Sequence, residues 1–301
     1  MRRLAFFIAL FASSAAWGQP RGPEYLKGKE PQGVPKRVVS LAPNLTEIMF
    51  AIGAGERVVG VTTYDDYPEA VKQLPRVGGF IDPSVEAILA LEPDLVVCTP
   101  NPGGRNRMDA LSRMGVPILV LPSYGMRDIF TVIKTLGELF GKKDSARELV
   151  DSMKKRIVNV AELIQGVRRP RVLLVYGHRP IMAAGPGSFG DGMLKLAGGE
   201  NVLKDSKMRY PNVPMEEIIR LMPEVIIDAS SSGTGAEMTR AEVGKVWGRW
   251  KVLPAVKNHR IHIFDSALWF RPGPRVALGL EKLFSILHPD RGGELDASGK
   301  R

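Results

Sequence analysis

The sequence predicts an α/β fold in which two similar α/β lobes with mainly parallel sheets are joined by a single long rigid helix. Three observations support this fold class. Short apolar runs alternate with helical patterns, as in parallel sheets covered by helices. A charged amphipathic stretch lies at residues 144–165, and a segment from the first half of the chain recurs in the second half.

The repeated segment is residues 86–97, which matches residues 216–227 in order and spacing, at a constant offset of 216 − 86 = 130. Both copies read as a helix followed by a proline, an acidic residue and an apolar strand. The first strand of each half also begins in the same way, after Pro35 and after Pro170. A repeat of this length predicts two lobes of one design.

The stretch from Asp144 to Gln165 has the three-and-four apolar spacing of an amphipathic helix. Asp144 is a suitable N-cap, and Gly166 supplies a stop signal. We therefore expect an N-terminal lobe at 36–143, a linker helix at 144–168 and a C-terminal lobe at 169–288. The apolar positions of the helix are Leu149, Met153, Ile157, Val160 and Ile164.

The two ends of the chain lie outside these lobes. Arg2 and Arg3 precede an apolar run that ends near small residues, which predicts a cleavable signal peptide at 1–18. That run is too short to span a membrane. Cys98, the single cysteine, does not follow the signal, so we expect a periplasmic protein without a lipid anchor. The polar, Gly-rich residues 289–301 predict a disordered tail.

Composition excludes some classes of function. The chain of 301 residues is 44% hydrophobic and 25% charged, which suits two ordinary cores. Its formal charge of +10 is scattered along the sequence, and only 7% of residues are aromatic. A nucleic-acid binder would concentrate basic and aromatic residues on one element, so we expect no nucleic-acid partner. Cys98 lies in an apolar run and should be a buried hydrophobe.

The N-terminal lobe reads as alternating strands and helices. Asn44 with Glu47 forms a capping-box pattern for the first helix, which should end at Gly53. The loop at 63–68 is rich in groups that stack or accept hydrogen bonds. The expected strands are 37–42, 58–62, 95–98 and 118–121, and the further helices are 84–91 and a segment ending at Met114.

The C-terminal lobe repeats the alternation. Residues 185–190 match a dinucleotide fingerprint formally, but they lie beyond the first strand and lack the acidic partner, so we interpret them as a Gly-rich turn before a helix. Ligands of such sheets bind outside the carboxyl ends of the strands. The expected strands are 172–176, 181–184, 225–227 and 260–264, and the helices are 192–197, 216–221, 239–250 and one ending at Leu287.

Motifs for chemistry are missing. There is no G-x-S-x-G elbow, P-loop, paired-cysteine motif or H-E-x-x-H. The four histidines do not cluster, and His259 and His262 should face opposite sides of one strand. His178 follows a strand and precedes Arg179, where a cleft should open, so it is an ordinary loop histidine, a ligand contact or a metal ligand.

The sequence resembles the periplasmic substrate-binding proteins of the cobalamin, haem and iron-siderophore ABC importers. The resemblance covers nearly all of residues 37–289, and it implies two α/β lobes joined by a rigid helix, a helical-backbone periplasmic binding protein. The motifs that carry it are R-V-V-S-L-A-P-N-L-T-E from Arg37, V-G-V-T-T-Y-D-D-Y-P from Val59, V-E-A-I-L-A-L-E-P-D-L-V-V from Val85, L-A-G-G-E-N-V from Leu196 and R-P-G-P-R from Arg271.

Within that family the D-Y-P, G-G-F and R-P-G-P-R motifs are most similar to the cobalamin-binding branch. The resemblance implies ligand contacts at Tyr64, Phe80, Tyr210 and Arg271, and we add His178 and Trp269 as candidates. Two positions depart from the pattern. Thr99 stands where an aromatic residue can occur, and Phe270 replaces an acidic residue.

These residues indicate capture of a corrinoid such as cobalamin, without enzymatic chemistry and without a cofactor. The implied partner is an ABC importer permease dimer in the inner membrane, and we expect the protein to be a monomer. The alternative ligand is haem or a ferric siderophore, which Arg179, Arg209 and Arg271 would clamp as an anion. A secreted bilobal metalloenzyme is the remote alternative, and it would need metal ligands.

Glu86 and Glu216 occupy equivalent places in the repeat, each in the first turn of a helix. A carboxylate there stabilises a helix through its dipole by about 0.3–1 kcal/mol. The family resemblance assigns both residues a second role, in docking to the two permease subunits. A permease with two identical subunits would present a matching pair of contacts.

Overall fold

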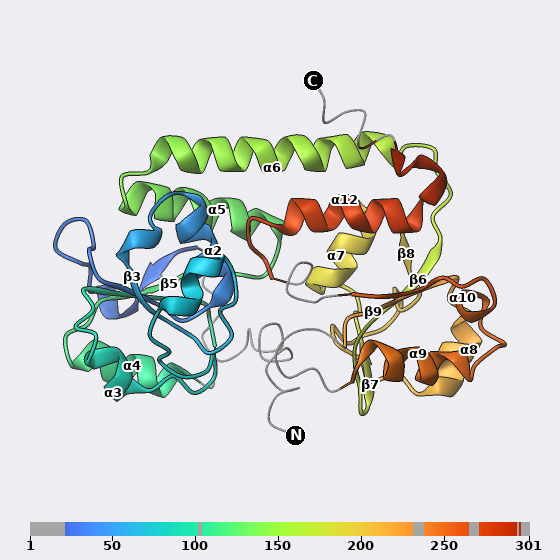
Figure 1. Ribbon diagram of the computed structural model, residues 1–301, viewed down its shortest axis with the longest axis horizontal. Coiled ribbons are helices and arrows are strands. Elements are labelled where there is room, and N and C mark those ends of the chain that lie inside the picture. The colour runs from blue at the N-terminus through green and yellow to red at the C-terminus, as the bar shows by residue number, and fades with distance from the viewer. Residues whose placement is uncertain (1–21, 102–103, 231–237, 265–270, 294, 296–301) are drawn as a thin grey trace. The chain divides into compact units, whose positions relative to one another are not determined.

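The computed structural model describes residues 22–101, 104–230, 238–264, 271–293 and 295. The chain divides into two compact units (Figure 1). Among these residues the N-terminal unit runs to Met153 and includes Pro272–Pro274, and the C-terminal unit comprises Lys154–Arg271 and the residues from Arg275 onward. The predicted signal peptide lies outside the described residues.

The N-terminal unit contains a five-stranded sheet with the order β1-β5-β4-β2-β3. β2, β3, β4 and β5 pair in parallel, and β1 pairs with β5 in the antiparallel sense. The mainly parallel sheet predicted for this lobe is therefore confirmed. The strands are β1 (Glu24–Tyr25), β2 (Val38–Ser40), β3 (Val58–Val61), β4 (Leu95–Cys98) and β5 (Ile118–Val120).

Helices cover both faces of this sheet (Figure 1). Val96 and Cys98 of β4 face a core that includes Ile88 and Met108 from the helices below the sheet in that view. Alternate strand residues point to the opposite face, because successive side chains of a strand alternate. The helices are α2 (Pro43–Ala51) and α5 (Met126–Leu139) on one face, and α3 (Val85–Leu89) and α4 (Arg105–Arg113) on the other, with short 3-10 turns η1 (Leu26–Gly28), η2 (Gly55–Arg57) and η3 (Glu69–Gln73).

The sheet of the C-terminal unit has the order β10-β9-β6-β7, and β8 pairs with the start of β6. β10, β9, β6 and β8 are parallel, whereas β7 folds back on β6 as an antiparallel hairpin. The strands are β6 (Arg171–His178), β7 (Ile181–Ala183), β8 (Glu200–Asn201), β9 (Val225–Asp228) and β10 (Ile261–Ile263).

This sheet is also covered on both faces (Figure 1). One core contains Leu173, Ile226, Ile218 and the fully buried Trp247. The helices on that face are α8 (Met215–Leu221), α9 (Arg240–Gly248) and α10 (Pro254–Lys257), and those on the other are α7 (Phe189–Leu196) and α12 (Val276–Leu287), followed by the 3-10 turn η5 (Pro289–Arg291).

The long helix α6 (Lys143–Leu163) confirms the predicted continuous helix. The division between the two units falls inside it, between Met153 and Lys154. Asp144 lies in its first turn, where its carboxylate pairs with Arg147 at 2.7 Å. Within the C-terminal unit, Arg156 pairs with Glu281 of α12 at 2.6 Å, which fixes the second half of α6 to that unit.

The repeat predicted from the sequence is also present in the structure. β4 and β9 begin at Leu95 and Val225, and 225 − 95 = 130. In each unit an arginine donates Nη2 to a carbonyl at the end of the repeated segment's helix. Arg37, directly before β2, donates to the Leu91 carbonyl just after α3 (2.7 Å), and Arg171, the first residue of β6, donates to the carbonyl of Leu221, the last residue of α8 (2.6 Å). The acidic residue after each repeated proline accepts the backbone N–H of the same arginine.

Several local expectations were wrong. Asn44 is not the N-cap of α2, because Pro43 occupies the first helical position and Ala42 precedes the helix without a side-chain cap. Asn44 and Glu47 are both buried instead. β1 and α5 were missed, and the N-terminal unit begins before residue 36. His259 does not lie on β10, since it has a φ of 56° and belongs to the preceding turn.

Other expectations held. Ser188 caps α7 by accepting the backbone N–H of Asp191, so the Gly-rich turn does precede a helix, although α7 begins at Phe189 and not at the expected residue 192. Cys98 is buried, and burial raises the pKa of its thiol to about 12. The predicted disordered tail, in contrast, is wrong at its start, because Pro289–Arg291 form η5, and most residues after it lie outside the described part. Within the described ranges no helix combines the length and hydrophobicity that crossing a membrane requires.

Candidate ligand-binding site

The N-terminal unit has a cavity at the carboxyl ends of its central strands. β2 lies between β3 and β4, so the connections from this part of the sheet run in opposite directions. Ligands of open α/β sheets bind outside the strand ends at such a switch point. A small cavity is present there, lined by Leu41, Phe80, Pro83, Cys98, Thr99, Asn101, Gly104 and Met108.

Phe80 forms one wall of this cavity and is only 3% exposed. Its backbone carbonyl accepts a hydrogen bond from the Asn101 amide. The preceding turn is tight, since Gly78 has a φ of 100° and a Cβ there would approach the Asp82 carbonyl. Thr99, the departure from the cobalamin-binding pattern, is buried and lines the same cavity.

Tyr64 lies on the loop after β3 and is half-buried. The Asp65 carboxylate accepts hydrogen bonds from the Thr62 hydroxyl (2.5 Å) and backbone N–H (3.0 Å), and Arg76 donates to the carbonyls of Thr62 and Asp65, each at 2.8 Å. A Cβ on Gly79 would lie 3.4 Å from the Tyr64 ring. Tyr64 and Phe80 are therefore on neighbouring loops.

Tyr210 in the C-terminal unit is half-buried and packs edge-on against Tyr176, with ring centroids 5.8 Å apart and an interplanar angle of 63°. Burial raises the pKa of Tyr210, so its phenol is neutral. The backbone of Arg209 accepts the Gly185 N–H at 2.8 Å, and a Cβ on Gly185 would overlap the Met208 carbonyl. The Gly-rich turn thus holds the loop that presents Tyr210.

The His178 side chain is 4% exposed and donates Nε2 to Asp228 Oδ2 at 2.7 Å. Trp247 donates Nε1 to the same oxygen at 2.6 Å, and the Ser230 hydroxyl donates to Oδ1 at 2.6 Å. Burial alone would raise the pKa of Asp228, but these hydrogen bonds and the His178 ring hold it below its ordinary value. This arrangement favours the structural interpretation of His178 over ligand contact.

Sequence reasoning missed Asp228, Ser230 and Trp247. The available signal was an aspartate at the end of the apolar run V-I-I-D, because a carboxylate in a buried strand requires donors. It also missed Asp65 and Arg76, which hold the Tyr64 loop.

The arginines occupy different environments. Arg179 and Arg209 are exposed, whereas Arg271 is half-buried. Arg179 lies close enough to Glu242 of α9 to help lower the pKa of that carboxyl, behind its larger hydrogen bonds from Thr239. The carbonyl of Pro272, directly after Arg271, accepts the Asn44 amide at 3.3 Å within the N-terminal unit. Trp269 and Phe270 lie outside the described residues.

Glu86 and Glu216 are both exposed, in the first turns of α3 and α8. Its own backbone N–H and the Ser84 hydroxyl lower the pKa of the Glu86 carboxyl. The Ser84 hydroxyl also caps α3.

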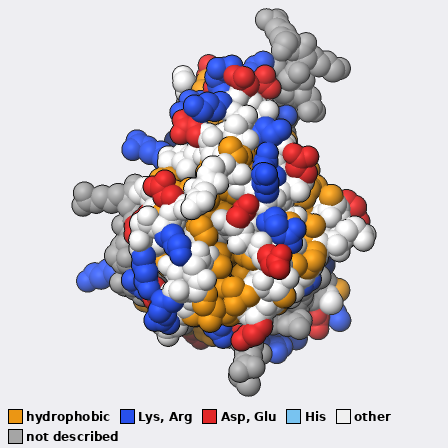
Figure 2. Space-filling model, turned by 90° about the vertical axis from the view of Figure 1, so that its left-hand side faces the viewer, with side chains coloured by type: hydrophobic (Ala, Val, Ile, Leu, Met, Phe, Trp, Pro, Cys, Tyr) orange, Lys and Arg blue, Asp and Glu red, His pale blue; other side chains and the backbone are white. Residues whose placement is uncertain are grey.

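Basic and acidic side chains are interspersed over the face shown in Figure 2, in agreement with the scattered charge of the sequence. Among the described residues no group of three His, Cys, Asp or Glu could hold a metal ion.

The chain is similar to substrate-binding proteins of ABC transporters. An uncharacterized ABC transporter substrate-binding lipoprotein, YvrC of Bacillus subtilis (strain 168), is 30% identical over 263 residues, 85% of this chain and 81% of the relative. The vitamin B12-binding protein of Yersinia pestis (strain Pestoides F) is 27% identical over 254 residues, 84% of this chain and 86% of the relative.

A solved structure shares the fold. The periplasmic heme binding protein of Pseudomonas aeruginosa is 28% identical, with a TM-score of 0.77, and the match covers 85% of this chain and 93% of that one. The periplasmic binding protein family matches residues 38–268, a range that runs from β2 to β10 and includes α6. Its members include substrate-binding components of importers of the B12, haem and iron type, and an importer permease is their partner. The chain belongs to the periplasmic binding protein family.

Proposed function

We propose that the protein captures a corrinoid, without chemistry, and delivers it to an inner-membrane ABC importer. One observation carries the choice of a large ring ligand. Each unit carries a half-buried aromatic side chain on a loop, Tyr64 after β3 and Tyr210 before α8. The flat faces of aromatic side chains can pack against a large ring ligand. Each aromatic contact contributes about 0.5–1.5 kcal/mol beyond the free energy gained from burying its surface area.

The ligand contacts are assigned within each unit. In the N-terminal unit Tyr64 is the half-buried aromatic that a ligand can reach, and Phe80 supports the cavity wall behind it. In the C-terminal unit Tyr210 supplies the second aromatic contact, and Arg271 a polar one. His178 is the weakest of the predicted contacts because Asp228 already binds its ring.

The second candidate ligand is haem or a ferric siderophore. The exposed guanidinium groups of Arg179 and Arg209 favour it, because they can pair with carboxylates or other anionic groups of such ligands. A solved structure with 28% identity is titled a heme binding protein. The visible spectrum of protein purified from its native periplasm distinguishes the ligands, since corrinoid, haem and ferric-siderophore bands differ.

Docking to the permease uses Glu86 and Glu216 in this proposal. Both carboxylates are exposed, and they stand at equivalent positions of the repeat.

We further propose that the mature protein is a soluble monomer released by cleavage after residue 18. The relative YvrC is named a lipoprotein, so the mass of the mature protein tests the absence of an anchor directly.

Melting-temperature shifts test the choice of ligand. A ligand at 100 times its dissociation constant adds roughly 2.7 kcal/mol to the stability of the folded state. Cyanocobalamin, haemin and a ferric siderophore are added separately to the mature protein. The proposal expects the largest upward shift with cyanocobalamin. An upward shift with haemin or the siderophore alone would indicate that this compound, and not a corrinoid, is the ligand of the protein.

A further inference from the structure

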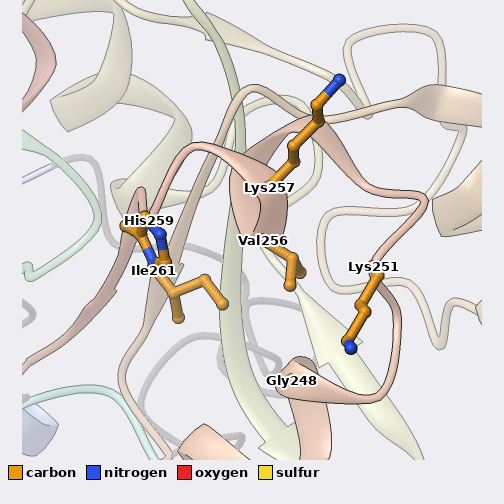
Figure 3. Close-up of a pocket in the computed structure, with 6 residues that line it drawn as sticks. All are labelled: Gly248, Lys251, Val256, Lys257, His259 and Ile261. Atoms are coloured by element: carbon orange, nitrogen blue, oxygen red, sulfur yellow. The ribbon is translucent and has the colours of Figure 1, made fainter.

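The C-terminal unit carries a surface hollow away from the residues assigned to ligand binding. Its volume is about 560 Å³, and it is lined by parts of α9, α10 and β10 (Figure 3). Its lining is mainly apolar around Val256 and Ile261, whose side chains are half-buried. The other lining residues are Gly248, Lys251, Lys257 and His259.

Positive charge borders this hollow. Lys251 and Lys257 are exposed, and neither forms an ion pair within the described part of the chain. Figure 3 shows the Lys251 side chain beside Gly248, with the Lys257 side chain extending outward from α10. The His259 ring is exposed next to Ile261. A partner that fills the hollow would therefore gain by carrying negative charge.

Among the strands of the described residues, β10 is the edge strand of its sheet. The Arg260 carbonyl accepts the Ile226 N–H (3.0 Å), and the Phe264 N–H donates to the Asp228 carbonyl (2.7 Å). Backbone groups alternate in direction along a parallel strand, so those of Ile261 and Ile263 face away from β9. The Ile263 carbonyl accepts Arg240 Nη2 at 2.8 Å. The N–H and carbonyl of Ile261, beside the hollow, have no such partner among the described residues.

We propose that this edge binds an extended acidic peptide segment of a partner protein, which adds a short strand to β10. The backbone of Ile261 would supply main-chain hydrogen bonds, and the hollow would take an apolar side chain of the peptide. Lys251 and Lys257 would pair with flanking carboxylates. Strand addition uses this combination of main-chain bonds for affinity and a side-chain pocket for specificity.

The alternative role for the lysines is protection of the edge. Lysine beside a short edge strand discourages unwanted pairing between sheets. The two roles differ in one respect. Protection by charge requires no partner, whereas the proposed site must bind an acidic peptide and must lose that binding when its charge is reversed.

The test uses the full mature protein and a fluorescein-labelled eight-residue peptide of alternating glutamate and valine, measured by fluorescence polarisation at low salt. We expect saturable binding, which weakens at least about tenfold in Lys251→Glu with Lys257→Glu. The matched control is Lys134→Glu with Lys143→Glu, which changes net charge equally at exposed lysines of the other unit and should bind like the parent.

Two further arms separate strand addition from general electrostatics. A peptide with proline at alternate positions lacks every second backbone N–H donor and should bind at least about tenfold more weakly, and exchange of the Ile261 amide with solvent should slow when the parent peptide binds. Equal binding of the proline peptide would overturn strand addition. Absence of binding, or equal loss in the control variant, would overturn the site and leave edge protection as the role of the lysines.

Discussion

Strands β4 and β9 occupy equivalent places in the two units, yet β4 ends in the thiol of Cys98 and β9 ends in the carboxylate of Asp228 (228 − 98 = 130). The thiol lines a small cavity with Thr99 and Phe80. The carboxylate is fully buried beneath His178, Ser230 and Trp247. The repeat therefore keeps the same backbone arrangement in both units, while the residue at the strand end is a buried thiol in one unit and a hydrogen-bonded carboxylate in the other.

Asp228→Ala should give the largest effect of these tests. The substitution leaves the donors on His178, Trp247 and Ser230 without their acceptor, in a region with almost no solvent access. Removing one partner from a buried charged network costs about 3–5 kcal/mol. Urea unfolding measures the loss. Cys98→Ala is the matched change in the other unit and should cost much less. Similar losses would mean that the two strand ends do not differ as described.

Gly190→Ala should destabilise the C-terminal unit by about 1–3 kcal/mol, because the added Cβ would overlap the Tyr176 hydroxyl. Gly192→Ala on the same helix is the control. A Cβ there meets nothing within 4 Å, so the change should stabilise α7 by up to about 1 kcal/mol. Thermal melts of both variants measure the difference. Equal effects at both positions would contradict close packing of α7 against Tyr176.

Acid should reduce the stability contributed by Asp228 at the end of β9, and it should not affect Cys98 at the end of β4. Because the pKa of Asp228 is lowered in the folded state, its stabilisation is complete above the unfolded pKa, about 3.9, and is lost as pH falls through the folded pKa. The thiol of Cys98, with a pKa of about 12, stays neutral throughout. Melting temperatures from pH 7 to pH 3 should fall more steeply for the parent than for Asp228→Asn. Parallel curves would contradict this account.

Glu86→Ala with Glu216→Ala should leave the melting temperature and ligand affinity nearly unchanged, since both side chains are exposed. Uptake through the cognate importer should collapse, because one docking contact is lost from each unit. Glu148→Ala with Glu162→Ala removes two exposed carboxylates of α6 and serves as the control. Uptake by the double docking variant at the parental rate would remove the docking role, and loss of uptake in the control would show a general effect of charge.

Sequence reasoning predicted the elements that have strong local signals. The 130-residue repeat fixed the expected boundaries of β4 and β9, and apolar spacing located α6. Sequence reasoning failed where contacts between residues far apart in the chain determine the role of a side chain. Asn44 resembles a cap locally, but Pro43 begins the helix and Asn44 is buried against Ser123 and Pro272. Likewise the partners of Asp228 come from three separate segments, and no spacing in the sequence brings His178 and Trp247 together.

The central claim is that the half-buried aromatic residues of the two units, Tyr64 and Tyr210, contact a ring ligand, and calorimetric titration of the mature protein with cyanocobalamin tests it most directly. The account predicts one bound corrinoid per chain, nearly parental binding by Tyr210→Phe, which keeps the ring, and at least about tenfold weaker binding by Tyr210→Ala. No heat at tens of micromolar cyanocobalamin, with binding of haemin or a ferric siderophore by the same preparation, would contradict it.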